Sequence, residues 1–294
     1  MAKRPRGKTK ADQRGASRRP ARRRGIGVVW LLPALGLALA LVAVAAAVHE
    51  RQRPAASRPV PAVVGGPVPA DIAHDLTAIP EATWNRVGAV DTGHPQIVGA
   101  LSATGTPVVL YVGAEFCPNC AATRWSLVAA LERFGTFTGL ALSASSATDT
   151  FPSTPTLTML HARYQSRYVA LETVELQGNT QDASGQYPPL QRLTPSQAAL
   201  YSHDDPSGYI PFLLVGGRYL LVGSSFSPAL LQGMDWQTIA AGLPLGTTAA
   251  ARAILGAANA MSAEICAVDG GAPAAVCRSA GVRNAAALLP QPGK

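Results

Sequence analysis

The chain has 294 residues, of which 48% are hydrophobic, and this is enough apolar material for a sizeable buried core. Of its 25 Lys and Arg residues, 11 lie in residues 1–25, where Asp12 is the one acid, so 14 basic and 16 acidic groups remain for the rest of the chain. The part after residue 25 is therefore near neutral. Beside an apolar segment, a basic tail sets membrane orientation and binds anionic lipid, so no nucleic-acid partner is expected.

Residues 26–48 form a stretch of 23 residues without a charge, rich in Leu, Val and Ala. About 20 apolar residues are enough to cross a bilayer, whereas the apolar part of a cleaved signal peptide has about 7 to 15. The sequence predicts a single-pass anchor in the lipid bilayer of the cell membrane, with residues 1–25 in the cytoplasm and the C-terminal part extracytoplasmic. A cleaved signal peptide is the alternative, since Ala43-Val44-Ala45 is an acceptable cleavage site.

Residues 49–80 are rich in Pro, Ala and Val and show neither a helical nor a strand period. Prolines at this density favour extended polyproline geometry, so we expect a stalk here. One domain at 81–280 accounts for most of the remaining chain, followed by a C-terminal tail at 281–294. Trp84–Val87 and Ile97–Leu101 are lead-in segments whose period is too weak to assign a type.

The first elements of this domain are an apolar strand at 108–112 and a helix at 118–134 that stops at Gly135. Residues 137–142 are predicted as the next strand, followed by a polar stretch at 143–158. Residues 164–176 contain several β-branched and aromatic residues, which favour one or two strands within an insertion.

The second half of the domain has clearer start signals. Thr194-Pro195-Ser196-Gln197 has the pattern of a capping box with proline at the first helical position, which predicts a helix to about residue 202. Two apolar runs at 212–215 and 218–222, joined by Gly216-Gly217, predict a hairpin. Further helices are predicted from Ser227-Pro228 to about Leu243 and from Thr247 or Thr248 to Cys266.

Two cysteines stand at the junction of the first strand and helix, in Cys117-Pro118-Asn119-Cys120. A dithiol that exchanges disulfides needs one exposed sulfur and a second sulfur one helical turn away, which resolves the mixed disulfide. The helix N-terminus favours the thiolate of the first sulfur. The spacing therefore predicts a redox disulfide in which Cys117 is the nucleophile and Cys120 the resolving thiol.

The other two cysteines, Cys266 and Cys277, form a second natural pair near the C-terminus. Four cysteines, an even number, in a domain placed outside the cytoplasm fit an oxidising compartment. We therefore expect a structural disulfide between them.

The segment Val109–Cys120 resembles the strand-to-helix corner of the thioredoxin superfamily, and Ile210-Pro211 before the hairpin resembles the cis-proline loop of that superfamily. Trp84–Cys277 as a whole resembles a family of membrane-anchored thioredoxin-like proteins classed as a domain of unknown function. The resemblance implies an α/β thioredoxin-like fold with an insertion between the CxxC helix and the cis-Pro hairpin, at about residues 143–200, preceded by one transmembrane helix.

The resemblance also implies roles at matched positions. Cys117 attacks, Cys120 resolves, and Pro211 packs against the pair in a cis bond that leaves a backbone edge open to a client chain. The residues expected to surround these three groups are Glu115, Phe116, Pro118, Asn119 and Ile210.

This chain departs from the superfamily pattern at two positions, Tyr111 and Asn119. Thioredoxins carry a buried acid where Tyr111 stands here, and a tyrosine is a poor base at neutral pH. Glu115 is closer to the cysteines but is expected to project toward solvent. Extracytoplasmic disulfide oxidases have histidine at the place of Asn119, so this dithiol is expected to be a weaker oxidant, and the direction of electron flow stays open.

The favoured function is a membrane-anchored extracytoplasmic thiol-disulfide oxidoreductase whose partners are client protein thiols or disulfides and a membrane or soluble redox partner. The alternative is a redox-inert thioredoxin-like binding module with structural disulfides. No metal and no cofactor is expected, because the cysteines lack zinc spacing and the candidate copper ligands, His161 and His203, are isolated. Trp84, Trp125 and Trp236 are expected to pack rather than bind a ligand.

Overall fold

The computed structural model describes residues 65–89, 96–98 and 105–290. The basic tail, the predicted transmembrane helix at 26–48 and the stalk up to residue 64 lie outside these residues. Within the described ranges, none of the helices has the length and apolar character needed to span a membrane.

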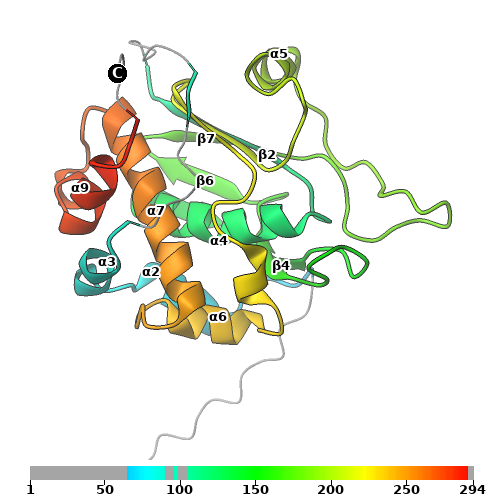
Figure 1. Cartoon of the computed structure of the whole chain (residues 1–294), viewed down its shortest axis with the longest axis horizontal. Helices are drawn as coiled ribbons and strands as arrows, with labels where there is room; N and C mark the ends of the chain where they lie inside the picture. Colours follow the sequence, from blue (N-terminus) through cyan, green and yellow to red (C-terminus); the bar gives the residue numbers. More distant parts are fainter. Residues whose placement is uncertain (1–64, 90–95, 99–104, 291–294) are drawn as a thin grey trace, which may run out of the picture. The chain divides into compact units, whose positions relative to one another are not determined.

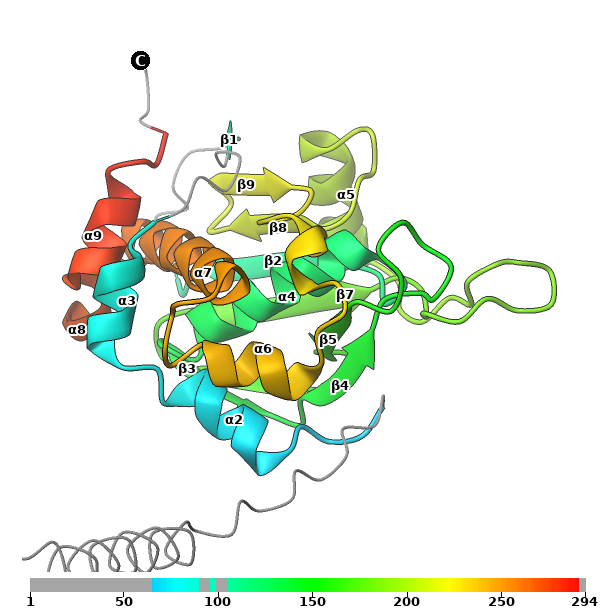
Figure 2. The ribbon, with the colours of Figure 1, turned by 60° about the horizontal axis from the view of Figure 1, so that its bottom comes forward.

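A mixed five-stranded sheet lies at the centre of the fold, with strand order β1-β9-β8-β2-β7 (Figure 2). Its members are β1 (Gln96–Ile97), β2 (Val108–Gly113), β7 (Ala170–Glu175), β8 (Phe212–Val215) and β9 (Tyr219–Val222). Strands β2 and β7 are parallel, and the other neighbouring pairs are antiparallel. The sheet and the helices around it make an α/β fold.

Strand β2 is buried on both faces because its side chains alternate between two apolar clusters. Val109 and Tyr111 face the larger cluster, formed with helices α4 (Pro118–Leu131) and α7 (Ala249–Val268). Leu110 and Val112 face a smaller cluster, which Tyr201 of helix α5 (Pro195–Asp204) borders. Figure 1 shows α7 crossing α4 over the sheet. The strand and the helix that carry the dithiol are thus fixed from several sides.

The predicted start signals of the second half are confirmed. Thr194 accepts a hydrogen bond from Gln197 N and completes the capping box of α5. Strands β8 and β9 form the predicted hairpin, whose turn places Gly216 and Gly217 at φ 59° and 65°, a region that favours glycine. Thr248 caps α7 through Ala251 N.

Four short strands lie between α4 and β7 and form two small antiparallel sheets. β3 (Gly135–Thr138) pairs with β6 (Arg163–Ser166), and β4 (Ala141–Ala144) pairs with β5 (Pro155–Thr158). The single strand predicted at 137–142 is therefore wrong, because the chain turns at Gly139, whose φ is 77°. The polar stretch at 143–158 contains β5, and β7 belongs to the central sheet rather than to an insertion.

Helix α4 ends at Leu131, three residues before the predicted end, and the chain then enters β3. The single helix predicted from Pro228 to Leu243 is also wrong. It is split into a 3-10 helix, η2 (Pro228–Leu231), and α6 (Trp236–Gly242), because Gly233 has φ 72° and Asp235 starts a new helix by accepting from Thr238 N at 2.7 Å.

The described part of the expected stalk contains helix α2 (Ala70–Thr77), whose Ile72 and Leu76 are buried in the larger cluster. Helix α3 (Glu81–Val87) follows and includes the untyped lead-in segment at 84–87. Pro69 and Pro80 precede the first residues of these helices, where a missing N–H costs nothing. The prolines at these two positions mark helix starts rather than an extended stalk.

The last two helices of the described residues are short: α8 (Ala274–Cys277) and α9 (Ala280–Ala286). Helix α9 occupies part of the segment expected to be a tail at 281–294, and its Val282 and Ala285 are buried against α7. The prediction of a tail is therefore wrong for residues 281–286, whose small side chains allow close packing.

Candidate functional site

The Cys117–Cys120 pair stands at the first turn of α4, as the sequence predicts, and both are free thiols. Cys117 is the N-cap, and its Sγ accepts the backbone N–H of Cys120 at 3.2 Å. Pro118 occupies the first helical position, where its fixed φ suits the helix start. Cys117 is 6% exposed and Cys120 is fully buried, so a reagent from solvent meets Cys117 first.

The two thiols differ in acidity because the Cys117 sulfur accepts a hydrogen bond that the Cys120 side chain donates. The pKa of Cys117 is lowered, mainly by the hydrogen bond from the Cys120 side chain, with help from the Cys120 N–H and the Arg124 charge and against the effect of burial. Burial raises the pKa of Cys120 well above its ordinary value, and the neighbouring Cys117 raises it further. Cys117 is therefore the more acidic of the two thiols.

The loop before β8 lies against the dithiol. The Ile210-Pro211 bond is cis, and the Cys117 thiol points toward the Ile210 carbonyl with an S–O distance of 3.9 Å. The Pro211 carbonyl accepts from Gly223 N at 2.8 Å, which ties this loop to the end of the hairpin. Tyr209, two residues before Pro211, is 66% exposed. The structure thus brings Cys117 and Ile210, the residue before the cis proline, together across 93 residues of sequence.

A buried ionic group lies next to the dithiol and was not predicted. Arg124 follows Cys120 by one helical turn, is fully buried, and contacts both carboxylate oxygens of Glu175 at 2.8 and 2.9 Å. Its Nε also donates to Tyr111 Oη at 3.2 Å. Arg124 is the one charged residue between Cys120 and Leu131, which is the signal that sequence inspection could have used. Nothing local marks Glu175 as its partner.

The expectation that Glu115 projects toward solvent is wrong, because its residue exposure is 5%. Its carboxylate accepts hydrogen bonds from the hydroxyls of Ser143 and Thr158 and lies 3.7 Å from Arg124 Nη1. The hydroxyl donors come from β4 and β5. A buried carboxylate is tolerated here because donors and a cation surround it.

Burial strongly shifts the pKa values of Glu175 and Tyr111, which both contact Arg124. It raises the pKa of Glu175 to about 7, against the opposing charge of Arg124. It also raises the pKa of Tyr111 well above its ordinary value. Tyr111 therefore stays neutral.

Phe116 and Asn119 complete the surroundings of the pair. The ring of Phe116 stacks on Tyr187, with 4.3 Å between ring centroids and an interplanar angle of 8°. Tyr187 belongs to the long loop between β7 and α5 that extends away from the body of the fold in Figure 2. Its hydroxyl donates to Ser146 Oγ at 2.8 Å. Asn119 is half-buried on the first turn of α4.

Residues 99–189 match the model of a domain of unknown function (DUF929). The match covers β2, α4 and β7, and hence both cysteines of the dithiol together with Arg124 and Glu175. It ends before Pro211 and the Cys266–Cys277 pair. Neither a curated protein nor a solved structure matches the chain.

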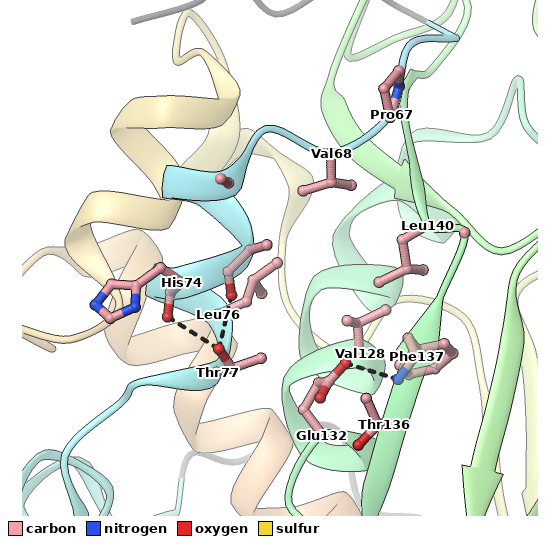
Figure 3. Close-up of a pocket in the computed structure, with 13 residues that line it drawn as sticks. Pro67, Val68, His74, Leu76, Thr77, Val128, Glu132, Thr136, Phe137 and Leu140 are labelled. Atoms are coloured by element: carbon pink, nitrogen blue, oxygen red, sulfur yellow. Dashed lines mark hydrogen bonds between the residues drawn. The ribbon is translucent and has the colours of Figure 1, made fainter. Parts of the chain in front are cut away.

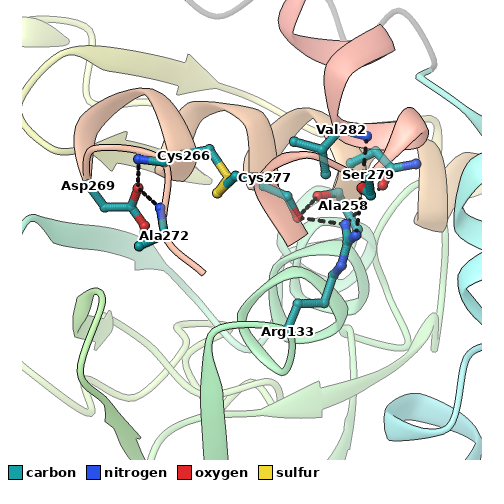
Figure 4. Close-up of a disulfide and its surroundings, with 11 residues drawn as sticks. Arg133, Ala258, Cys266, Asp269, Ala272, Cys277, Ser279 and Val282 are labelled. Carbon is teal, nitrogen blue, oxygen red and sulfur yellow. Dashed lines mark hydrogen bonds between the residues drawn. A yellow bond between two sulfur atoms is a disulfide. The ribbon is translucent and has the colours of Figure 1, made fainter. Parts of the chain in front are cut away.

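Cys266 and Cys277 are joined in a disulfide outside the segment matched by DUF929 (Figure 4). The bond connects the last turn of α7 to α8, with 5.6 Å between the two Cα atoms. Asp269 fixes the intervening turn by accepting from Gly271 N and Ala272 N at 2.8 and 3.1 Å. This pair closes a local loop and lies on elements other than those of the dithiol.

A cavity of about 450 Å³ lies between α2, α4 and β3, at the end of α4 opposite to the dithiol (Figure 3). Its walls are mainly apolar, with Leu76, Val128, Phe137 and Leu140 pointing inward. Glu132 lines the cavity and accepts from Phe137 N at 3.1 Å. The cavity shares no lining residue with the surroundings of Cys117.

His161 and His203 lie on the exposed surface, and His203 pairs with its neighbour Asp204 at 2.7 Å. Across the described ranges, no group of three or more His, Cys, Asp or Glu side chains is placed to hold a metal ion. Trp84 and Trp125 are buried in the larger cluster, and Trp236 donates to Thr156 O at 2.8 Å.

Proposed function

We propose that this protein is a thiol-disulfide oxidoreductase with an elaborated thioredoxin-like fold, held outside the cytoplasm by residues 26–48. One observation carries the proposal. Two free thiols whose pKa values are shifted in opposite directions stand at the start of a helix, and the more acidic thiol faces a cis-proline loop.

The order of elements supports the fold assignment. Strand β2, the dithiol, helix α4, the Ile210-Pro211 bond and the β8–β9 hairpin follow one another along the chain and meet in one place. This is the order on which the resemblance to the thioredoxin superfamily rests. The additional strands β3 to β6 account for part of the extra length between α4 and the hairpin.

The environments of the two sulfurs define the reaction. The Cys117 thiolate attacks one sulfur of a client disulfide, and the other client sulfur leaves as a thiolate that takes up a proton. Cys120 then loses its proton and attacks Cys117, which releases the second client thiol and leaves a Cys117–Cys120 disulfide. The client gains two electrons and the dithiol loses two. Running the same steps in reverse oxidises a client dithiol.

Burial of Cys120 restricts it to the second step. Because its sulfur is shielded from solvent, an external disulfide cannot reach it before Cys117 has reacted. The low exposure of Cys117 itself, 6%, favours the alternative of a redox-inert binding module. The two functions differ in whether the pair exchanges with external thiols.

The reduction potential of the Cys117–Cys120 pair tests the proposal. The full-length protein in detergent micelles is equilibrated with glutathione redox buffers, and the two sulfurs are quantified by alkylation and mass spectrometry. Known exchangers lie between about −270 and −120 mV, and we expect a value in this range. A potential below about −300 mV, typical of structural disulfides, would contradict an exchange function and support the binding module. Cys266–Cys277 in the same sample is the internal control and should stay oxidised.

A further inference from the structure

The buried guanidinium of Arg124 is connected to the nucleophile through one carbonyl group. The Ala114 carbonyl accepts from Arg124 Nη2 at 2.8 Å and from Cys117 N at 3.2 Å. Arg124 thus holds the turn that places Cys117 at the helix start, in addition to bringing a positive charge close to the dithiol.

The charges around Arg124 do not balance. Glu175 from β7 binds the guanidinium through two oxygens, and Glu115 lies 3.7 Å from Nη1. Nη1 is buried and has no hydrogen-bond partner among the described residues. Tyr111 from β2 contributes a neutral hydroxyl. One cation therefore faces two carboxylates, and both signs of charge lie next to the sulfurs in a water-excluded region where charges act strongly.

We propose that Arg124 is a positioning residue that stabilises the Cys117 thiolate and that, together with Glu175, it sets the reduction potential of the dithiol. This inference rests on the proposed function. The reduced pair carries a thiolate charge that the disulfide lacks, so a nearby cation favours the reduced form and a nearby anion opposes it. Arg124 supplies the positive charge that Asn119 does not.

Removing the Glu175 anion and removing the Arg124 cation should change the stability of the thiolate in opposite directions. A purely structural role of the two residues would not produce this difference in sign. Glu175→Gln keeps the guanidinium and removes an anion, so the thiolate should become more stable. Arg124→Met combined with Glu175→Gln removes the cation together with its bidentate partner and leaves Glu115 with the hydroxyl donors Ser143 and Thr158, so the thiolate should lose the cation's support. Arg124→Lys combined with Glu175→Gln keeps a cation and should resemble Glu175→Gln.

The experiment measures the equilibrium in which the protein disulfide and two glutathione thiols give the dithiol and glutathione disulfide, for the full-length protein at pH 8. We expect Glu175→Gln to shift this equilibrium at least threefold toward the dithiol. In the double variant Arg124→Met, Glu175→Gln, the equilibrium constant for forming the dithiol should be at least tenfold lower than in Glu175→Gln alone. A tenfold change corresponds to about 30 mV for a two-electron couple. At pH 6 the wild type and Glu175→Gln should converge, because burial raises the pKa of Glu175 to about 7 and the group is then neutral.

Thiolate absorbance at 240 nm gives an independent measurement, since it titrates Cys117 directly in chemically reduced protein. The difference from Cys117→Ala isolates that sulfur. The matched control is Glu264→Gln, which removes a buried carboxylate on α7 and should shift neither measurement. A double variant that is no less reducible than Glu175→Gln, or no shift in either variant, would overturn the proposal. A wild-type pair that resists glutathione would refute the proposed function, while the titration would still decide the role of Arg124.

Discussion

The N-terminal turn of α4 holds both cysteines of one pair, whereas the C-terminal turn of α7 holds one cysteine of the other pair, and the two turns provide different surroundings. At α4 the sulfurs are free, three residues apart, and Cys117 is the N-cap of the helix. At α7 the sulfurs are bonded and the bridge spans eleven residues between two helices. A helix N-terminus stabilises a thiolate, whereas a bridge between helix ends restricts the chain. The two cysteine pairs thus differ in their position on the helix as well as in their bonding.

Buried charge differs between the same two regions. Next to the dithiol, Glu175 and Glu115 share the guanidinium of Arg124. Glu264, two residues before Cys266, is 3% exposed and has no ionic partner within the part of the chain that the structure describes. Paired charges suit a site whose own charge changes during a reaction, and an unpaired acid makes its region sensitive to pH.

The largest effect is expected from removing the resolving thiol. Cys120→Ala in cells should accumulate mixed disulfides between client proteins and Cys117, because the second attack is no longer possible. Non-reducing electrophoresis of alkylated extracts detects these species as bands that vanish on reduction.

Cys117→Ala is the matched variant, since it removes the other sulfur of the same turn. It should trap no client, because Cys120 is shielded from solvent. Equal trapping by both variants would remove the distinction between nucleophile and resolving thiol. Trapping through Cys266 or Cys277 would instead assign exchange to the second pair.

The second effect sharpens the contrast between the pairs. Replacing Cys266 and Cys277 by Ala should lower the free energy of unfolding by about 3 kcal/mol, because the bridge no longer restricts the unfolded chain. Urea unfolding followed by circular dichroism measures this loss. Exchange by Cys117 and Cys120 should persist in the same variant. A loss of exchange with unchanged stability would reverse the roles of the two pairs.

The features that the sequence predicts correctly are local. The CxxC spacing, the capping box at Thr194 and the Gly216-Gly217 turn each act over a few residues, so their signals are complete within one segment. Arg124 and Glu175 are 51 residues apart and meet only because β2 and β7 pair in parallel. Their pairing is a property of the sheet, which no short pattern contains.

Two predictions are wrong for identifiable physical reasons: the extended stalk around residues 69 and 80, and the exposure of Glu115. The prolines near residues 69 and 80 favour an extended stalk when counted by density, but the same fixed φ suits the residue before a helix. Glu115 was expected in solvent because it is charged and ends a strand. The hydroxyls of Ser143 and Thr158, which reach it from β4 and β5, make burial possible.

The smallest effect concerns the unpaired acid beside the second cysteine pair. Burial raises the pKa of Glu264 to about 8, from an ordinary value of 4.5. In the unfolded chain the group therefore loses its proton near pH 4.5, whereas in the folded protein it keeps the proton until about pH 8. Its contribution to stability is complete below the lower value and is lost as the pH rises toward the higher one.

Between pH 5 and pH 7 this loss amounts to about 2 to 3 kcal/mol, at about 1.4 kcal/mol for each pH unit. Glu264→Gln removes the titrating group, so the difference in unfolding free energy between the variant and the wild type should grow by that amount over the interval. Urea unfolding at pH 5, 6 and 7 measures it, with Glu172→Gln, an exposed carboxylate on β7, as the control. A constant difference across the three pH values would show that Glu264 ionises normally in the folded state, and the contrast in buried charge between the two regions would then disappear.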